Sequence, residues 1–237
     1  MVVALILAGG TGTRLGADIP KQYIEINGKP IISYCLDVFQ QHADVDCIQV
    51  VADEQWHEYI AQYIQGEKMR GFSRPGENRQ LSIYHGLCDI QKYGTHTDVV
   101  IVHDAARPNV SSDMITECIT AAQGHDGAIP VLPMKDTIYL SENGSTISAL
   151  ISREKLYAGQ APEAFKLGKY IMANEALFPD RIKSINGSTE PAIISHMDMV
   201  MIRGDESNFK ITTTADLERF KRMIQGMKGD NADDGRK

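Results

Sequence analysis

The sequence predicts an α/β protein with a Rossmann-like, mostly parallel sheet that carries helices on both faces. From residue 2 to about residue 132, short β-rich apolar runs alternate with segments of helical periodicity. The first run, residues 2–8, is apolar without alternation, as in a strand covered on both faces. Glycine-rich or charged segments follow three of the strands, where sheets of this kind bind ligands.

Residue spacing gives the expected elements of this part. Strands are expected at residues 2–8, 47–52, 98–103 and 128–132, and helices at residues 31–41, 54–65, 80–92 and 112–123. In the first helix, the residues that share one apolar face are Ile32, Cys35, Leu36 and Phe39. After residue 150 we expect a helix at 168–178, strands at 199–202 and 209–212, and a last helix at 215–225. Thr213 and Asp216 are placed to cap that last helix.

Residues 137–150 contain two short β-like runs around Asn143 and Gly144, a dipeptide typical of hairpin turns. Their faces are only moderately apolar, so we expect a projecting β-arm at about residues 137–153. No repeat or low-complexity linker divides the chain, which predicts a single domain over residues 1–227. The polar tail, residues 228–237, is expected to be disordered.

Composition excludes several classes of protein. The 237 residues carry a net charge of -7, with a pI of about 5.5, which argues against nucleic-acid binding. No apolar run approaches the roughly 20 residues of a membrane span, and the start lacks the basic region of a signal peptide. We therefore expect a cytoplasmic protein that binds no membrane. The four cysteines are expected to be reduced and mostly buried, and they lie too far apart in the sequence for a zinc site. They are Cys35, Cys47, Cys88 and Cys118.

The loop LAGGTGTRLG, residues 7–16, directly follows the first strand. A dinucleotide fingerprint needs G-x-G-x-x-G, and here the third glycine, Gly16, comes one residue late. A Walker loop needs Gly-Lys-Ser or Gly-Lys-Thr, which the chain lacks. What remains is a strand, exposed amides and the cations Arg14 and Lys21, a combination that suits a triphosphate. The alternative is an ordinary glycine turn with solvated charges.

This loop and the following PKQY resemble the nucleotide-binding signature of the CDP-alditol-forming cytidylyltransferases. That family comprises the D-ribitol-5-phosphate and the 2-C-methyl-D-erythritol 4-phosphate cytidylyltransferases. Further blocks continue the resemblance in order to about residue 227: PGENRQLSI, VHDAARP, KDTI, SREKLYAGQAPEAF and NFKITTTADL. The resemblance implies a nucleotide-diphospho-sugar transferase-like fold. It also implies transfer of CMP from CTP to an alditol phosphate, with release of pyrophosphate.

The resemblance also implies roles for individual residues. The residues implied in CTP binding are Leu7, Ala8, Gly9, Gly10, Thr11, Gly12, Thr13, Gly76, Arg79 and Ser82. The residues implied in catalysis are Arg14, Lys21, Arg153 and Lys210. Those implied in binding the alditol phosphate are Asp104, Arg107, Thr137, Arg153, Thr189 and Lys210, and Asp104 is also the implied ligand of Mg²⁺. From the residues alone, Asp104 fits an N-cap or a salt bridge with Arg107 equally well.

The implied reaction needs little acid–base chemistry, because an alditol phosphate is already a nucleophile at neutral pH. Alignment and charge stabilisation would then supply most of the catalysis. His103, beside Asp104, is expected to be a packed strand-end histidine rather than a catalytic base. The family further implies a homodimer in which the β-arm carries Thr137 and Arg153 into the partner's site.

The choice of alditol phosphate depends on smaller features. YAGQAPEAF resembles the GQTPQ block of the ribitol enzymes more than the LTPQ of the methylerythritol enzymes, and GTGTRLG and SNFKITTTADL favour ribitol too. GENR and APEAF depart from both patterns, and STEPA stands where methylerythritol enzymes have Thr-Asp-Glu. Ribitol 5-phosphate is favoured, with 2-C-methyl-D-erythritol 4-phosphate or another polyol phosphate as alternatives. The pathway, cell-wall polymer or isoprenoid synthesis, therefore stays open.

Two rivals from other classes remain. A nucleotide-dependent oxidoreductase is disfavoured by the misplaced third glycine. A nucleotide-sensing protein without catalytic activity is disfavoured by the joint presence of Arg14, Lys21, Asp104 and Lys210.

Overall fold

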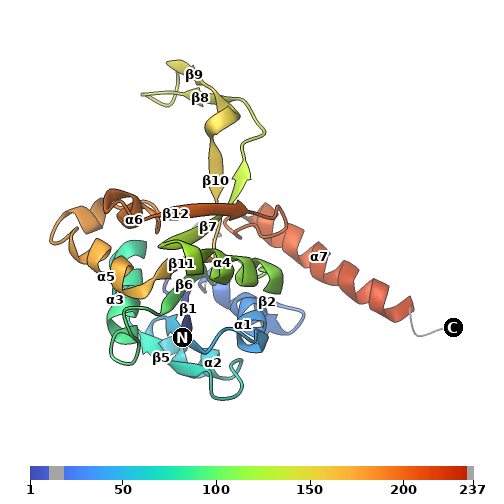
Figure 1. The fold of residues 1–237 in the computed structure, drawn as a ribbon. Coiled ribbons are helices and arrows are strands. Elements are labelled where there is room, and N and C mark those ends of the chain that lie inside the picture. Colours follow the sequence, from blue (N-terminus) through green and yellow to red (C-terminus); the bar gives the residue numbers. More distant parts are fainter. Residues whose placement is uncertain (11–18, 234–237) are drawn as a thin grey trace.

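A mixed eight-stranded sheet forms the centre of the computed structural model, which describes residues 1–10 and 19–233, with side chains up to residue 226 (Figure 1). Its strands are β1 (Val2–Leu7), β4 (Cys47–Val51), β5 (Met69–Ser73), β6 (Val99–Asp104), β7 (Gly127–Pro133), β10 (Tyr157–Gly159), β11 (Glu163–Lys166) and β12 (Met199–Arg203). Their order is β10-β7-β11-β6-β1-β4-β5, and β12 also pairs with β7. Strands β6, β1, β4 and β5 are parallel, whereas β11 runs antiparallel between β6 and β7. The predicted α/β class with a mostly parallel sheet is confirmed.

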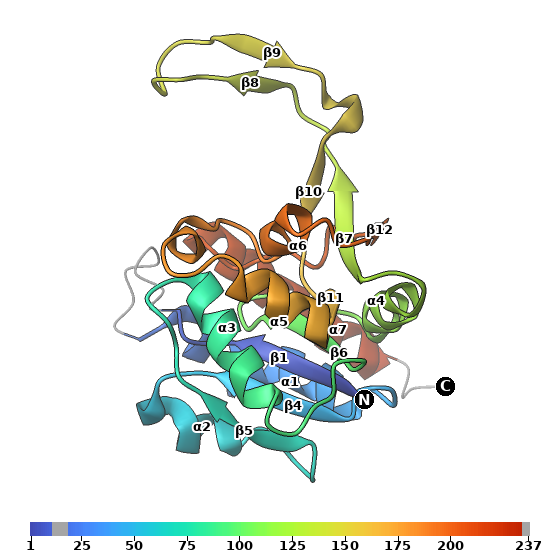
Figure 2. The same ribbon diagram turned by 60° about the vertical axis from the view of Figure 1, so that its left-hand side comes forward.

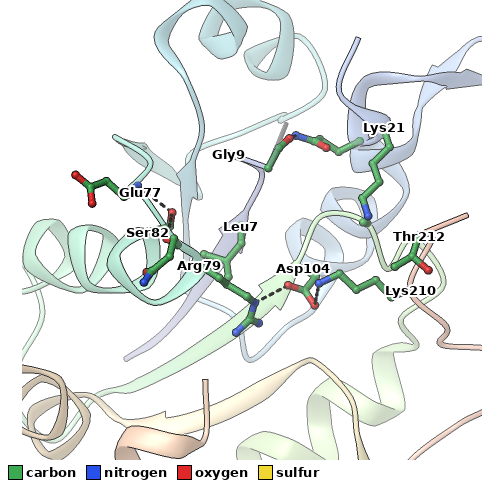
Figure 3. Close-up of a pocket in the computed structure, with 14 residues that line it drawn as sticks. Leu7, Gly9, Lys21, Glu77, Arg79, Ser82, Asp104, Lys210 and Thr212 are labelled. Atoms are coloured by element: carbon green, nitrogen blue, oxygen red, sulfur yellow. Dashed lines mark hydrogen bonds and ion pairs between the residues drawn. The ribbon is translucent and has the colours of Figure 1, made fainter. Parts of the chain in front are cut away.

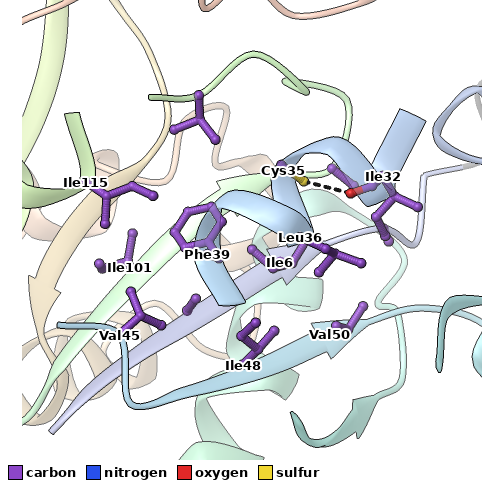
Figure 4. Close-up of a cluster of buried hydrophobic side chains, with 14 of the residues drawn as sticks. Ile6, Ile32, Cys35, Leu36, Phe39, Val45, Ile48, Val50, Ile101 and Ile115 are labelled. Carbon is purple, nitrogen blue, oxygen red and sulfur yellow. Dashed lines mark hydrogen bonds between the residues drawn. The ribbon is translucent and has the colours of Figure 1, made fainter. Parts of the chain in front are cut away.

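Helices cover both faces of this sheet. They are α1 (Ile31–Gln41), α2 (His57–Ala61), α3 (Arg79–Ile90), α4 (Ser112–Gly124), α5 (Leu167–Glu175), α6 (Glu190–Ile194) and α7 (Thr214–Asp233). On β1, Ala4 and Ile6 belong to a buried cluster with α1 and α4 (Figure 4). The alternate residues Val3 and Leu5 belong to a second cluster with α3 and α5, which lie side by side (Figure 2). Burial on both faces explains why the strand sequence is apolar without alternation.

Most expected elements lie within one or two residues of their predicted positions, but the helix expected at 54–65 is shorter. It consists of the 3₁₀ turn η3 (Glu54–Trp56) and α2. The N–H groups of Tyr63 and Ile64 bond to carbonyls three residues back, at Ile60 and Ala61. The chain therefore tightens into a 3₁₀-type turn after residue 61 instead of continuing the α-helix.

The strand expected at residues 209–212 is a loop instead. Ile211 donates a backbone hydrogen bond to Ala106 (2.8 Å), but the N–H of Thr212 donates to the carboxylate of Asp216 (3.0 Å). That N–H is therefore not available for a strand ladder. The same carboxylate accepts from the Thr213 N–H, and the Thr213 hydroxyl accepts from the Asp216 N–H, which confirms the predicted cap of the last helix.

Helix α7 continues to Asp233, into the segment that the sequence predicted to be disordered. No proline interrupts residues 214–233, so the backbone hydrogen bonds can continue through the two glycines of this stretch. Residues 234–237 lie outside the described part of the chain. Within the described residues, no helix combines the length and the apolarity that crossing a bilayer requires. The four cysteines are free, and Cys35, Cys47 and Cys118 are buried.

Strands β5 and β11 were not predicted from the sequence. Strand β5 includes Arg70 and Gly71, which interrupt its apolar pattern, and β11 has only four residues. The small pairs β2 (Glu25–Ile26) and β3 (Lys29–Pro30) are also too short for a periodicity signal. Strand β11 matters most for function, because it borders β6 and carries Glu163 to the carboxyl end of that strand.

The segment between β7 and β10 projects from the body (Figures 1 and 2). It ends in the antiparallel pair β8 (Ile138–Leu140) and β9 (Ala149–Ile151). Between them, the Asn143 side-chain oxygen accepts from the N–H groups of Ser145 and Thr146 (2.9 and 3.0 Å). Four apolar side chains of this pair and its turn are 47–68% exposed, namely Tyr139, Leu140, Ile147 and Leu150.

Truncation of Phe39 in α1 tests this packing. The side chain is fully buried against β1 and β4, and its ring lies 5.1 Å from that of His103. We expect Phe39→Ala to lower the free energy of unfolding by about 3–5 kcal/mol, measured by urea denaturation. The exposed residue Gln41 of the same helix is the control, and Gln41→Ala should stay within about 0.5 kcal/mol of wild type. Equal effects of the two variants would contradict the packing described here.

Candidate active site

The chain leaves β1 close to a short 3₁₀ helix, η2 (Lys21–Tyr23). The Gln22 amide donates to the carbonyls of Ala8 and Gly10 (2.6 and 2.8 Å), and the Tyr23 hydroxyl donates to Ala8 (3.0 Å). These bonds fix η2, and with it Lys21, beside the strand end. A Cβ on Gly9 would lie 2.7 Å from Pro75, so only glycine allows this close approach.

The PGENRQLS block forms the start of α3. Asn78 caps the helix by accepting from the Leu81 N–H (2.8 Å), and the Gly76 N–H donates to the Ser82 hydroxyl (2.9 Å). A Cβ on Gly76 would lie 2.4 Å from the Cβ of Leu81, which explains the glycine. As the first residue of the helix, Arg79 extends from this capped turn toward the end of β6 (Figure 3).

Asp104 ends β6 and is only 7% exposed. Its carboxylate lies 3.1 Å from Arg79 Nε, 3.0 Å from Lys210 Nζ and 3.6 Å from Arg107 Nε. Figure 3 shows Arg79 and Lys210 reaching it from opposite sides. Burial by itself raises the pKa of Asp104, but the charges of Arg79, Lys210 and Arg107 outweigh it and hold that pKa well below its usual range.

Two pockets meet at this carboxylate. The first has a volume of about 450 Å³ and lies between the end of β1, η2 and the start of α3. The second has a volume of about 270 Å³ and lies between β11, the segment 186–189 and the loop after β12. Arg79, Asp104 and Lys210 line both pockets. A ligand in one pocket is thus separated from a ligand in the other by one group of charged side chains.

The loop that carries Lys210 is fixed although it is not a strand. Asn208 donates its side-chain amide to the carbonyl of Ala161 (2.7 Å), and its own carbonyl accepts from Arg107 (2.7 Å). Gln160 adds a bond to the carbonyl of Asp205 (2.8 Å). Lys210 is therefore held at the junction of the pockets by side-chain hydrogen bonds between its loop and two other segments, residues 160–161 and Arg107.

The structure brings most of the predicted site residues together. The predicted residues that line the first pocket are Leu7, Gly9, Gly10, Lys21, Gly76, Arg79, Ser82, Asp104 and Lys210. Arg107 and Thr189 line the second pocket, and Ala8 is buried beneath the strand end. The remaining residues predicted for the loop, Thr11, Gly12, Thr13 and Arg14, lie outside the described part of the chain.

Thr137 and Arg153 are not near the other predicted site residues. Both are exposed and line neither pocket. Thr137 precedes β8, and Arg153 begins the 3₁₀ turn η4 (Arg153–Lys155) and donates to the carbonyl of Lys135. Thr137 and Arg153 therefore contact neither pocket of their own chain, and the prediction that they enter a partner's site concerns a second copy of the chain.

His103 is a packed histidine, as predicted. It is fully buried, and its Nε2 bonds to the carbonyl of Arg107 (2.9 Å). Burial lowers the pKa of His103 to about 4, so the ring is neutral near pH 7. Its position one residue before Asp104 places it inside the core rather than in a pocket.

Sequence reasoning missed several residues that line the pockets, and three of them are polar side chains close to the predicted residues. Gln22 and Thr212 line the first pocket, and Glu163 lines the second. Gln22 acts through two backbone carbonyls, which leave no pattern in the sequence. Glu163 could have been noticed in the sequence, because it belongs to the APEAF segment, which departs from the family pattern.

Asp104→Asn removes the only negative charge that contacts all of Arg79, Arg107 and Lys210 in the described structure. We expect the free energy of unfolding to fall by about 2–4 kcal/mol at pH 7. This is below the range for a fully buried pair, because the side chains of Arg79 and Lys210 are 31% and 33% exposed.

The effect should depend on pH. Because the pKa of Asp104 is lower in the folded chain, its contribution is complete above about pH 4 and is lost as the pH falls further. Urea denaturation should give a constant difference between wild type and variant from pH 8 to 6. Below about pH 4 the difference should shrink by up to about 1.4 kcal/mol per pH unit. A difference that stays constant down to pH 3 would contradict the lowered pKa.

Comparison with known proteins agrees with this geometry. The family described as 2-C-methyl-D-erythritol 4-phosphate cytidylyltransferase (IspD) matches residues 2–225. A ribitol-5-phosphate cytidylyltransferase of Vibrio parahaemolyticus is 32% identical over 232 residues, covering 94% of this chain and 96% of the relative. A 2-C-methyl-D-erythritol 4-phosphate cytidylyltransferase of Geobacter metallireducens is 35% identical over 230 residues, covering 94% and 97%.

Solved structures have the same fold. The 2-C-methyl-D-erythritol 4-phosphate cytidylyltransferase (IspD) of Francisella tularensis superposes with a TM-score of 0.79 at 26% identity, over 92% of this chain and 97% of that one. A 4-diphosphocytidyl-2C-methyl-D-erythritol synthase from Anaerococcus prevotii has a TM-score of 0.80 at 23% identity, over 94% and 96%. The chain belongs to the 2-C-methyl-D-erythritol 4-phosphate cytidylyltransferase (IspD) family and is a cytidylyltransferase.

Proposed function

We propose that this cytidylyltransferase uses CTP and D-ribitol 5-phosphate, with 2-C-methyl-D-erythritol 4-phosphate or another polyol phosphate as the alternative acceptor. The observation that carries the proposal is the group of Arg79, Arg107 and Lys210 around Asp104, at the junction of two pockets. One pocket suits a nucleotide and the other a smaller anion. Both substrates are phosphate esters, so cations at their junction fit the reaction.

CTP would occupy the first pocket. The backbone at Gly9 and Gly10, with Lys21 beside it, offers amides and a positive charge for the triphosphate. Gly76, Arg79 and Ser82 at the start of α3 would form the wall for the cytidine part. Arg14 and the loop residues Thr11, Gly12 and Thr13 are proposed to complete the phosphate site, as the family pattern implies.

The acceptor would occupy the second pocket, with its phosphate toward Arg107 and Lys210. One of its phosphate oxygens attacks the α-phosphorus of CTP in line. The new P–O bond forms as the bond to the β-phosphate breaks, and pyrophosphate leaves with the electron pair. No base is needed, because the attacking oxygen is already an anion at neutral pH. The chain's own contribution is alignment, together with the charges of Lys21 and Lys210 near the transferred phosphoryl group.

Mg²⁺ is the proposed metal, and its donor set fits. Among the described residues, no group of three or more His, Cys, Asp or Glu side chains could hold a metal ion. Mg²⁺ does not require one, since it keeps several waters and binds phosphates with one or two carboxylates. Asp104 is the carboxylate at the junction of the pockets and would hold the ion. Bound there, Mg²⁺ would neutralise charge on the nucleotide phosphates.

Ribitol 5-phosphate is favoured over methylerythritol phosphate by the walls of the second pocket. Gln160, Asn186, Ser188 and Thr189 give these walls polar side chains, against the apolar Ile129 and Ala161. An unbranched chain with a hydroxyl on every carbon except the phosphorylated one matches such a surface better than a chain with a methyl branch. The GQTPQ-like block of the sequence supports the same choice.

The chain is proposed to act as a homodimer through its β-arm. The apolar side chains of Tyr139, Leu140, Ile147 and Leu150 are exposed, and an isolated hairpin of this size is marginal in water. A second copy would cover them. The same contact would bring Thr137 and Arg153 to the acceptor pocket of the partner, which explains why they are remote from the site within one chain.

Pyrophosphate release tests the function. Purified protein with CTP and Mg²⁺ should release pyrophosphate with D-ribitol 5-phosphate at a higher kcat/KM than with 2-C-methyl-D-erythritol 4-phosphate. The control is Lys21→Ala, which should lower kcat by about 10²–10³, because it removes one charge that stabilises the transition state. A higher kcat/KM with 2-C-methyl-D-erythritol 4-phosphate would identify that compound as the acceptor instead. Near wild-type turnover by the Lys21 variant would contradict the proposed site.

Subunit mixing tests the shared site. Lys21→Ala and Arg153→Ala are each expected to be inactive as homodimers. After subunit exchange, every heterodimer contains one site with both residues intact. Random pairing should restore roughly a quarter of wild-type activity. If heterodimers form, as shown by mass spectrometry of differently tagged subunits, and no activity returns, Arg153 acts within its own chain.

A further inference from the structure

Glu163 is a buried carboxylate in the wall of the second pocket. It begins β11, and the residue is only 6% exposed. The Ser188 hydroxyl donates to its Oε1 and the Thr189 hydroxyl donates to its Oε2 (2.5 Å). Arg79 Nη2 lies 3.8 Å from Oε1. Burial raises the pKa of Glu163 above its usual value, and Arg79 and the two hydroxyls oppose this shift by favouring the charged form.

These hydrogen bonds determine the direction of the O–H groups of Ser188 and Thr189. Each carboxylate oxygen of Glu163 contacts one hydroxyl, and Arg79 lies beside Oε1, an arrangement that matches an ionised carboxylate. An ionised carboxylate can only accept, so Ser188 and Thr189 each donate their proton to a hydrogen bond with Glu163. A hydroxyl that has donated its proton still carries lone pairs and can accept. Both residues line the second pocket, but Ser188 is buried, whereas Thr189 is partly exposed to it. What Thr189 offers to a bound molecule is therefore an acceptor and not a donor.

The backbone of this wall is held from behind. The Tyr170 hydroxyl donates to the carbonyl of Ser188 (2.7 Å), and the Gln80 amide contacts the Tyr170 hydroxyl (3.3 Å). Asn186 donates its N–H to the carboxylate of Glu190 (2.9 Å). Because the segment 186–189 is fixed by these bonds, the direction of the Thr189 proton depends on the group at position 163 and not on movement of the loop.

We propose that Glu163 is a specificity-determining positioning residue, which makes Thr189 an obligatory acceptor and thereby selects a substrate with a hydroxyl group at that point. This inference rests on the proposed acceptor pocket. A methyl group or a hydrogen there would leave the Thr189 lone pairs without a partner, and a buried acceptor without a partner is unfavourable. The acceptor is therefore a polyol phosphate with a free hydroxyl facing Thr189.

Glu163→Gln is the matched change. In the GQTPQ block that this segment resembles, the corresponding residue is glutamine. An amide has one accepting and one donating end, so it can accept a hydrogen bond from only one of the two hydroxyls. The variant keeps the size of the side chain and removes the requirement that both hydroxyls donate to position 163, so that Thr189 is no longer obliged to be an acceptor toward the pocket. Glu117 on α4 is exposed, and Glu117→Gln is the control for the same chemical change elsewhere.

The experiment measures the coupling between position 163 and single hydroxyls of the substrate. Pyrophosphate release is recorded for wild type, Glu163→Gln and Glu117→Gln with CTP. The acceptors are ribitol 5-phosphate and its monodeoxy analogues. We expect one deoxy analogue to lose about 10- to 100-fold in kcat/KM with wild type and with Glu117→Gln, the range for an unpaired buried polar group. With Glu163→Gln the same loss should be under about 3-fold, while the KM for CTP stays within about 3-fold of wild type.

Thr189→Val is the second variant, since it removes the hydroxyl without changing the buried charge. It should reduce the same loss for the same deoxy analogue. The inference would be overturned if wild type, Glu163→Gln and Thr189→Val lost the same factor in kcat/KM for every deoxy analogue. It would also be overturned if Glu163→Gln no longer discriminated among any of the acceptors and had a raised KM for CTP. If methylerythritol phosphate proves the better acceptor, the proposed substrate fails. The coupling is then measured with the deoxy analogues of that compound, where the same two outcomes decide.

Discussion

The contact on which the site depends is the buried carboxylate of Asp104 at the end of β6. Three cations from separate parts of the chain meet there: Arg79 from the start of α3, Arg107 from the loop after β6, and Lys210 from the loop before α7. Without the carboxylate these like charges would repel one another. With it, they form one group between the two pockets, in which Arg79 and Lys210 line both pockets and Arg107 lines the second.

Lys21 and Lys210 lie on short or irregular segments that side-chain hydrogen bonds hold in place. Gln22 ties η2 to the carbonyls at the end of β1, and Asn208 ties the Lys210 loop to Ala161. Each bond joins a polar side chain to a backbone group that secondary structure leaves unsatisfied. A reaction that needs alignment more than acid–base chemistry benefits from such fixed loops.

The two pockets also differ in how their polar groups are controlled. In the first, glycines allow close packing within the pocket wall, Gly9 against Pro75 and Gly76 against Leu81. In the second, the buried carboxylate of Glu163 accepts hydrogen bonds from the hydroxyls of the pocket wall. Under the proposed function, the first pocket holds CTP and the second discriminates among acceptors that differ by one hydroxyl.

The sequence by itself determined the α/β class, most strands and helices of the body, and the family, because these depend on local periodicity and on motifs that keep their order along the chain. It also predicted Lys21, Arg79, Asp104 and Lys210 as site residues through those motifs, and the structure brings them to one place. Only the tertiary structure decided that residues 209–212 form a loop and that β11 enters between β6 and β7. It alone places Glu163 against Ser188 and Thr189, some 25 residues away, because hydrogen bonds between distant segments leave no period in a sequence.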